Sequence, residues 1–105
     1  MLLTTRNELD GCRIKKELGL VSGSSVRSRI FFRDFFAGVR AFLGLEVKEY
    51  REMMDLARKL AKERMIEEAE KMGANAIVNI RYMTSMTSIR TSEIFVYGTA
   101  IEIET

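Results

Sequence analysis

The hydrophobic period of this chain changes abruptly at Gly73. After this glycine, apolar side chains recur at every second residue, which is the period of a strand. Before it, they recur every three or four residues, as on the buried face of a helix, at Val47, Tyr50, Met54, Ala57, Ala61, Met65, Ala69 and Met72. The pattern predicts a helix over 46–72, a left-handed cap at Gly73 and a strand that begins directly after the cap.

The predicted helix is long for so small a chain. At a rise of 1.5 Å per residue it would extend about 40 Å, more than a small domain usually spans. Its remaining positions carry Lys, Arg, Asp and Glu of mixed sign, which is typical of a solvated helix surface. A helix of this length must project or pack against a neighbouring subunit, so we expect an oligomer.

The N-terminal half predicts two strands and a shorter helix. Residues 2–5 form a short strand candidate, and residues 12–20 alternate as a strand with one wet face. Residues 21–25 predict a bend or bulge at Gly23, beyond which residues 26–30 continue the strand. Residues 31–43 predict a first helix, with its phenylalanines on one face.

The C-terminal part predicts two further strands separated by a loop. After Gly73, we expect Ala76 and Val78 to share one strand face with Ile80 and Tyr82, and the intervening residues to share the other. Residues 84–91 are rich in Ser, Thr and Met and predict a loop, whereas residues 92–104 predict a last strand with a core-like face that includes Phe95. The result is one α+β domain over residues 1–105. It has a small sheet of about three to four strands, one short and one long helix, and the order β-β-α-α-β-β.

Composition excludes several chemistries. The chain has no histidine, and Cys12 is its single cysteine. Ser-His-Asp and Cys-His catalysis within one chain, histidine metal sites and an intrachain disulfide are therefore excluded. The net charge is only +2, and phenylalanines at helical spacing between the arginines of 27–40 are more typical of a core than of a nucleic-acid surface. With no apolar run long enough for a membrane span, we expect a cytoplasmic protein.

Four segments resemble a known family. They are 18–23 (LGLVSG), 33–40 (RDFFAGVR), 64–82 (RMIEEAEKMGANAIVNIRY) and 97–100 (YGTA). Together they resemble the YbjQ-like family of small bacterial and archaeal proteins, in order and over nearly the whole chain. The resemblance implies α+β subunits that assemble into ring-shaped homopentamers. It also implies a heavy-metal-binding description and no established activity.

The heavy-metal description fits this sequence poorly. Soft metals require clustered thiolates, thioethers or imidazoles, whereas most methionines here lie at helical core spacing. Met83 and Met86 are the thioethers that lie in or beside the predicted loop. We therefore expect no metal site and no cofactor.

Two functions remain open. The first is a non-enzymatic homo-oligomeric domain that binds a small ligand, an ion or a protein partner at subunit interfaces. The second is an enzyme that acts on a small anionic substrate in an inter-subunit pocket, through Arg33, Asp34, Asn79 and Tyr97. The candidate ligand-binding residues are an acid-base pair at a helix start and four polar residues on strands: Arg33, Asp34, Asn79, Arg81, Tyr97 and Thr99.

Overall fold

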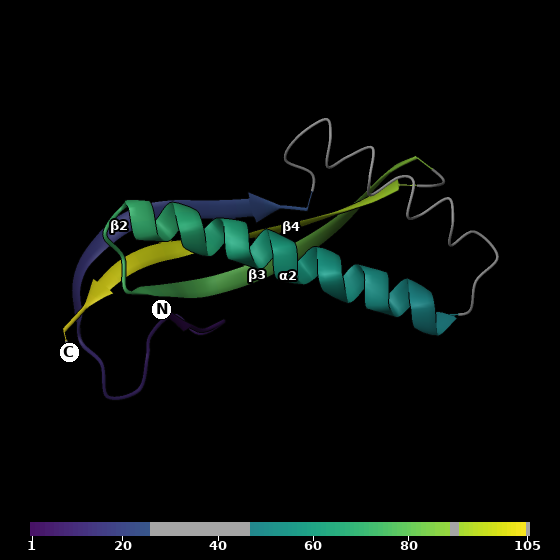
Figure 1. Cartoon of the computed structure of the whole chain (residues 1–105). Helices are drawn as coiled ribbons and strands as arrows, with labels where there is room; N and C mark the ends of the chain where they lie inside the picture. The colour runs from purple at the N-terminus through teal and green to yellow at the C-terminus, as the bar shows by residue number, and fades with distance from the viewer. Residues whose placement is uncertain (26–46, 89–90, 105) are drawn as a thin grey trace.

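The chain forms a four-stranded sheet with a long helix on one face (Figure 1). The computed structural model describes residues 1–25, 47–88 and 91–104. Their elements are β1 (Leu2–Leu3), β2 (Ile14–Ser24), α2 (Val47–Lys71), β3 (Ala76–Ser88) and β4 (Thr91–Ile103). The predicted α+β class and the long helix are confirmed, while the predicted strand 26–30 and short helix 31–43 lie outside the described residues.

The sheet is mixed, with the strand order β1-β3-β4-β2. The central strands β3 and β4 form an antiparallel pair, and β2 runs antiparallel along the other side of β4. β1 joins β3 in parallel, and the hydrogen bonds continue past it, because the Thr4 amide donates to the Ile77 carbonyl at 3.1 Å. The sequence therefore placed the N-terminal strand correctly, although the observed strand is shorter than predicted.

The core lies between α2 and the sheet. The predicted apolar helix stripe is confirmed by five buried side chains: Met54, Ala57, Ala61, Met65 and Ala69. They pack on Val21 of β2, Ile77 and Ile80 of β3, and Ile94, Val96 and Ala100 of β4. Met72, the last predicted member of the stripe, is instead exposed. In the described part, no helix is both long and apolar enough to cross a membrane.

Gly73 ends the helix as the sequence predicts. Its φ is +84°, in the left-handed region that favours glycine. The Ala74 amide donates to the Ala69 carbonyl at 3.1 Å, and the Gly73 amide donates to the Glu70 carbonyl at 3.0 Å. These two bonds form a Schellman cap, which satisfies carbonyls at the helix end.

A bulge at Asn79 overturns the predicted faces of β3. The register with β4 shifts between Val78 and Arg81, and Asn79 has a φ of 55°. The extra residue reverses the alternation. Ile77 and Ile80 therefore face α2, whereas Val78 packs with the cluster on the other side of the sheet. The prediction that Val78 and Ile80 share a face was wrong, because period-two reasoning assumes an unbroken ladder.

The predicted core face of β4 was also wrong along its first half. Ile94 and Val96 face the helix, whereas Phe95 lies on the opposite face and is 36% exposed. Further along, Ile101 and Ile103 are buried on that opposite face, where Leu9 and Cys12 of the N-terminal loop cover them. Both faces of β4 are apolar, so the sequence alone could not show which one α2 covers.

Two predicted irregular segments belong to strands. Residues 21–24 continue β2, and residues 84–88 continue β3. Gly23 is needed for packing rather than for a bend, since a Cβ built on it would lie 2.1 Å from the Ala61 carbonyl oxygen. The 84–88 segment pairs with β4 through the register Thr84↔Ile94 and Ser85↔Glu93. Backbone pairing of this kind needs no apolar alternation, so no pattern of side chains predicts it.

Candidate functional site

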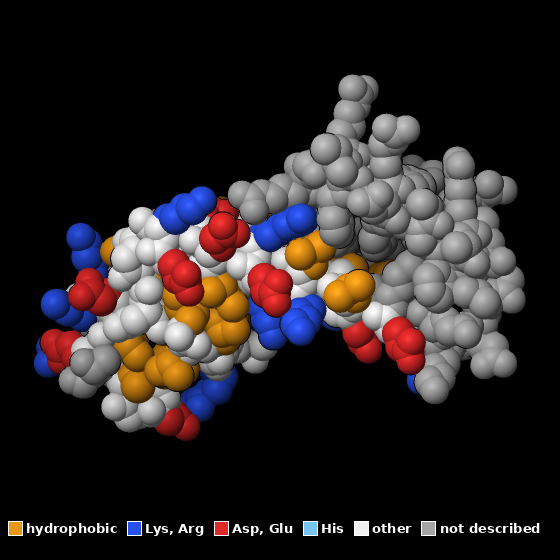
Figure 2. Space-filling view, viewed as in Figure 1, with side chains coloured by type: hydrophobic (Ala, Val, Ile, Leu, Met, Phe, Trp, Pro, Cys, Tyr) orange, Lys and Arg blue, Asp and Glu red, His pale blue; other side chains and the backbone are white. Residues whose placement is uncertain are grey.

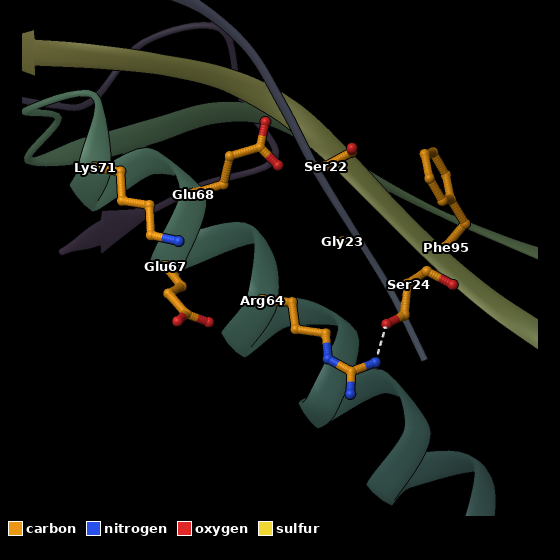
Figure 3. Close-up of a pocket in the computed structure, with 8 residues that line it drawn as sticks. All are labelled: Ser22, Gly23, Ser24, Arg64, Glu67, Glu68, Lys71 and Phe95. Carbon is orange, nitrogen blue, oxygen red and sulfur yellow. Dashed lines mark hydrogen bonds between the residues drawn. The ribbon is translucent and has the colours of Figure 1, made fainter. Parts of the chain in front are cut away.

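One hollow lies between the outer edge of β2 and the last turns of α2 (Figure 3). We call it the edge groove. It has a volume of about 270 Å³ and is lined by Ser22, Gly23, Ser24, Arg64, Glu67, Glu68, Lys71 and Phe95. In Figure 3 the Glu68 side chain extends toward the sheet, whereas Glu67 points away from it. The groove thus combines strand backbone with charges of both signs.

The backbone of β2 presents alternate residues to this groove. The Ser25 amide donates to the Ile94 carbonyl of β4 at 2.9 Å, so Ser25 faces its neighbouring strand. In an antiparallel ladder the backbone groups of successive residues point to opposite sides. The backbone N–H and C=O groups of Ser22 and Ser24 therefore point outward, away from β4. In agreement with this, the Arg64 guanidinium donates to the Ser24 carbonyl at 2.7 Å. No strand pairs with this edge in the described part of the chain.

Charges of both signs surround the helix. On the face shown in Figure 2, acidic and basic side chains are interspersed over α2 rather than gathered by sign. The Ser24 hydroxyl donates to the Glu93 carboxylate at 2.6 Å, which ties the end of β2 to β4. The surface next to the edge groove is therefore not a basic patch of the kind that binds nucleic acid.

Tyr82 has a shifted pKa. Partial burial raises the pKa of its phenol above the ordinary value, because burial disfavours the phenolate. The nearby Arg58 guanidinium opposes this effect. Tyr82 is 44% exposed and lies neither in the edge groove nor in the second hollow described next, so it indicates no catalytic acid or base.

Another hollow lies on the opposite face of the sheet. We call it the bulge pocket. It has a volume of about 170 Å³ and is lined by Asn7, Ile14, Glu17, Val78, Asn79, Thr99 and Ile101. Val78 and Ile101 are buried at its floor, and four polar side chains surround them.

The four predicted strand residues belong to this part of the sheet. Asn79 and Thr99 line the bulge pocket. Tyr97 is the register partner of Arg81, and its ring lies 6.3 Å from that of Phe95. The Arg81 guanidinium donates to the Thr5 and Ile80 carbonyls, both at 2.8 Å, and so fastens the N-terminal segment to β3. Arg33 and Asp34 lie outside the described residues, and the enzymatic hypothesis that needs them stays a hypothesis.

Sequence reasoning missed two contributors to the bulge pocket. Glu17 lies within the predicted strand 12–20, and Asn7 lies between this strand and the strand candidate at 2–5. Neither residue lies in a motif, and each reaches the pocket only because β2 and the N-terminal loop meet β4 there. The uncharged run of residues 18–25 is apparent in the sequence, whereas its position at the sheet edge is not.

The residues that the structure describes do not fit a heavy-metal site within one chain. Cys12 is half-buried beside the Ile101 and Ile103 cluster. Within 1–25, 47–88 and 91–104, no group of three or more His, Cys, Asp or Glu is placed to hold a metal ion. A soft metal would need several sulfur or imidazole ligands around one point.

Comparison with known proteins gives the family. The model of the YbjQ-like family, whose description reads "Putative heavy-metal-binding", matches residues 1–104. The α+β fold and this full-length match place the chain in that family, and we conclude that it belongs to it.

Relatives of similar length are numerous. A UPF0145 protein of Methanosarcina acetivorans is 43% identical over 103 residues, covering 98% of this chain and 97% of the relative. A UPF0145 protein of Thermotoga maritima is 43% identical over 104 residues, covering 99% and 98%. A crystal structure from Pediococcus pentosaceus, of a DUF74 protein with unknown function, is similar in fold, with a TM-score of 0.58, 19% identity and coverage of 99% and 98%.

Proposed function

We propose that this protein is a non-enzymatic homo-oligomeric domain whose subunits join along the outer edge of β2, with a ligand or protein partner bound where they meet. One observation carries the proposal. β2 is an edge strand, and the described residues provide no strand to cover it. An uncovered edge is a template for pairing with another chain.

The first part of this edge carries charges, at Lys15, Lys16 and Glu17, but from Leu18 onward it lacks the charges and the proline that normally prevent such pairing. Exposed edges are usually protected by Lys, Pro or other charges, whereas residues 18–25 contain neither a charged residue nor a proline. Leu20 is 72% exposed. Two residues further along, the backbone N–H and C=O groups of Ser22 point outward from the sheet edge. A second chain pairing here would satisfy those groups and cover Leu20.

The helix supports the same proposal. α2 has 25 residues, which corresponds to about 37 Å. Leu56 lies on its outer surface with 65% exposure. A neighbouring subunit that pairs with β2 would approach the edge groove and would have α2 within reach. The number five for the subunits is what the family resemblance implies.

The sheet face beside this edge supports ligand binding at the boundary. Ser22 is the register partner of Tyr97, and Tyr97 is in turn the partner of Arg81. The phenol of Tyr97 and the exposed ring of Phe95 therefore lie one strand away from the proposed interface. The guanidinium-bearing residue Arg81 lies two strands away. Such a mixture of aromatic and charged groups is common where proteins bind small molecules or partners.

The test is a pair of substitutions at Ser22. Ser22→Pro removes the outward amide, and proline is tolerated at an edge position whose amide faces solvent. Ser22→Thr keeps the amide and serves as the matched control. Native mass spectrometry should give an oligomer for the parent and for Ser22→Thr, and a monomer for Ser22→Pro.

Circular dichroism must show that Ser22→Pro remains folded. Leu56→Lys tests the helix contact separately and should weaken the assembly without abolishing strand pairing. A parent protein that is monomeric at micromolar concentration would contradict the proposal. An intact oligomer in folded Ser22→Pro would place the interface elsewhere.

A further inference from the structure

We propose that the bulge pocket binds a short ligand with a primary ammonium group, within a single subunit. This site lies on the sheet face opposite α2 and does not require the proposed assembly. It therefore goes beyond the function proposed above, and it can be tested independently of it.

The pocket lies where the strands on both sides of β4 lose their regular register at neighbouring positions along β4. β2 shifts between Ile14 and Lys16 and again between Glu17 and Gly19. β3 shifts between Val78 and Arg81. Bulges occur preferentially beside functional sites, because they redirect side chains.

The bulge in β3 has a specific consequence for the pocket. Val78 and Asn79 are adjacent in sequence, yet both line it. In a regular strand, neighbouring side chains point to opposite faces. The bulge therefore brings the side-chain amide of Asn79 to the same face as Val78. In a regular strand, Asn79 would point to the opposite face of the sheet.

Hydrogen bonds hold Asn79 in this conformation. Its φ of 55° is left-handed, a region that asparagine tolerates better than most residues do. The backbone amide of Asn79 donates to the Arg6 carbonyl at 2.9 Å, and the backbone amide of Ile80 donates to the Thr4 carbonyl at 3.2 Å. Because backbone contacts fix the bulge, the Asn79 side chain is not needed to hold it and remains available to a ligand.

The chemistry of the lining selects the ligand. The rim carries the Glu17 carboxylate, the Asn7 and Asn79 amides and the Thr99 hydroxyl. Within the described part of the chain, none of these four side chains has a protein hydrogen-bond partner. No Lys or Arg lines the pocket, so its one formal charge is negative. An ammonium group would find three acceptors and a carboxylate there.

The floor and the volume define the rest of the ligand. Val78, Ile101 and Ile14 provide an apolar surface for a short hydrocarbon stem. At about 30 Å³ per water-sized group, a pocket of about 170 Å³ holds roughly five or six such groups. A bare hard cation is disfavoured, because it would need six or more oxygen ligands and would leave the apolar floor wet. Butylammonium has the required size and charge.

The experiment titrates three probes of nearly equal shape into the protein. NMR chemical shifts of the backbone amides of Asn79 and Thr99 report binding. Butylammonium should shift both signals in a saturable manner. 1-Butanol should bind at least about tenfold more weakly, and butyrate should bind more weakly still, because Glu17 attracts only the cation. Butyrate or 1-butanol binding as tightly as butylammonium would overturn the assignment, and so would the absence of saturable shifts with any of the three.

Three variants test the residues. Glu17→Gln should weaken butylammonium binding about tenfold or more, whereas the control Glu8→Gln, an exposed loop residue outside the pocket, should not. Asn79→Gly keeps the positive φ without strain and removes the amide, so it should weaken binding while the fold persists. Unchanged affinity in both Glu17→Gln and Asn79→Gly would refute the site.

The Ser22→Pro variant separates this inference from the proposed assembly. A folded monomer that binds butylammonium with the parent affinity supports a site within one subunit. A folded monomer that has lost binding would show that the pocket depends on a neighbour and would overturn the inference. If Ser22→Pro stays oligomeric, the interface proposal fails. The Glu17 and Asn79 variants still decide whether the bulge pocket binds an ammonium group.

Discussion

Gly23→Ala should be among the most destabilising single methyl additions in this protein. A Cβ at Gly23 would lie 2.1 Å from the Ala61 carbonyl oxygen and 2.7 Å from the Met65 amide nitrogen. Both atoms belong to the backbone of α2, so no side-chain rotation can relieve the contact. To reach an ordinary separation of about 3.5 Å, helix and strand must move apart by about 1 Å or more.

That displacement affects the whole core. A radial gap of about 0.5 to 1 Å already loses a quarter to a half of a dispersion contact. The small side chains of α2 at Ala57, Ala61 and Ala69 cannot extend to fill such a gap. Overpacking typically costs about 1 to 3 kcal/mol and occasionally more. We expect a loss of about 3 kcal/mol or more, a large part of the roughly 5 to 15 kcal/mol that stabilises a domain.

The assay is equilibrium urea denaturation at one fixed protein concentration, because an oligomer's apparent stability depends on concentration. Gly98→Ala is the graded control. Its Cβ would meet two side-chain carbons, the Ile77 Cγ2 at 2.8 Å and the Ile80 Cγ1 at 3.2 Å, and one backbone atom, the Val78 carbonyl oxygen at 3.0 Å. Because the tightest of these contacts is with a side chain and the backbone contact is longer than those at Gly23, about 1 to 2 kcal/mol should be lost. Ala61→Gly should not rescue Gly23→Ala, because the obstacle is the carbonyl. A loss below about 1 kcal/mol, or rescue by Ala61→Gly, would refute the reasoning.

Further predictions concern the cap, a titration and metal binding. Gly73→Val should lower the free energy of unfolding by about 1 to 3 kcal/mol and Gly73→Asn by less, because valine is strongly disfavoured at positive φ; equal urea midpoints for Gly73→Val and the parent would refute the cap. Because folding raises the pKa of Tyr82, its phenol ionises at a lower pH in the unfolded chain than in the folded one. The free energy of unfolding should therefore be constant below about pH 10 with respect to this group and fall as pH rises through the folded pKa. Ultraviolet titration should show this shift, and Arg58→Ala should raise the pKa further; a midpoint below the ordinary value would contradict it. The isolated protein should bind no copper or zinc tightly, and stoichiometric metal that survives gel filtration and is lost in Cys12→Ser would overturn this.

Local patterns predicted the elements that depend on local chemistry. The stripe from Met54 to Ala69 specified α2, since a helix repeats its buried face within its own sequence. The Gly73 cap was equally local, because its bonds span only Ala69 to Ala74. Of the site residues, Asn79 and Thr99 were named from the sequence as polar residues on strands, and the structure brings these two to one pocket.

Predictions failed where distant segments decide the outcome. The faces of β3 depend on the bulge at Asn79, which the carbonyls of Thr4 and Arg6 hold from the other end of the chain. The 84–88 segment became strand because β4 pairs with it. Such bonds use backbone groups that every residue carries, so side-chain patterns do not announce them.

The amino-acid pattern alone was enough to predict the family, the long helix and its glycine cap, and the lack of histidine excluded histidine chemistry. Tertiary structure decided which face of β4 the helix covers, since Ile94 and Ile101 are equally apolar and only packing distinguishes them. It also decided that β2 lies at the sheet edge and that Glu17 and Asn79 meet at one pocket. Helix periodicity arises from contacts a few residues apart, whereas an edge or a pocket arises from segments that only the folded chain brings together.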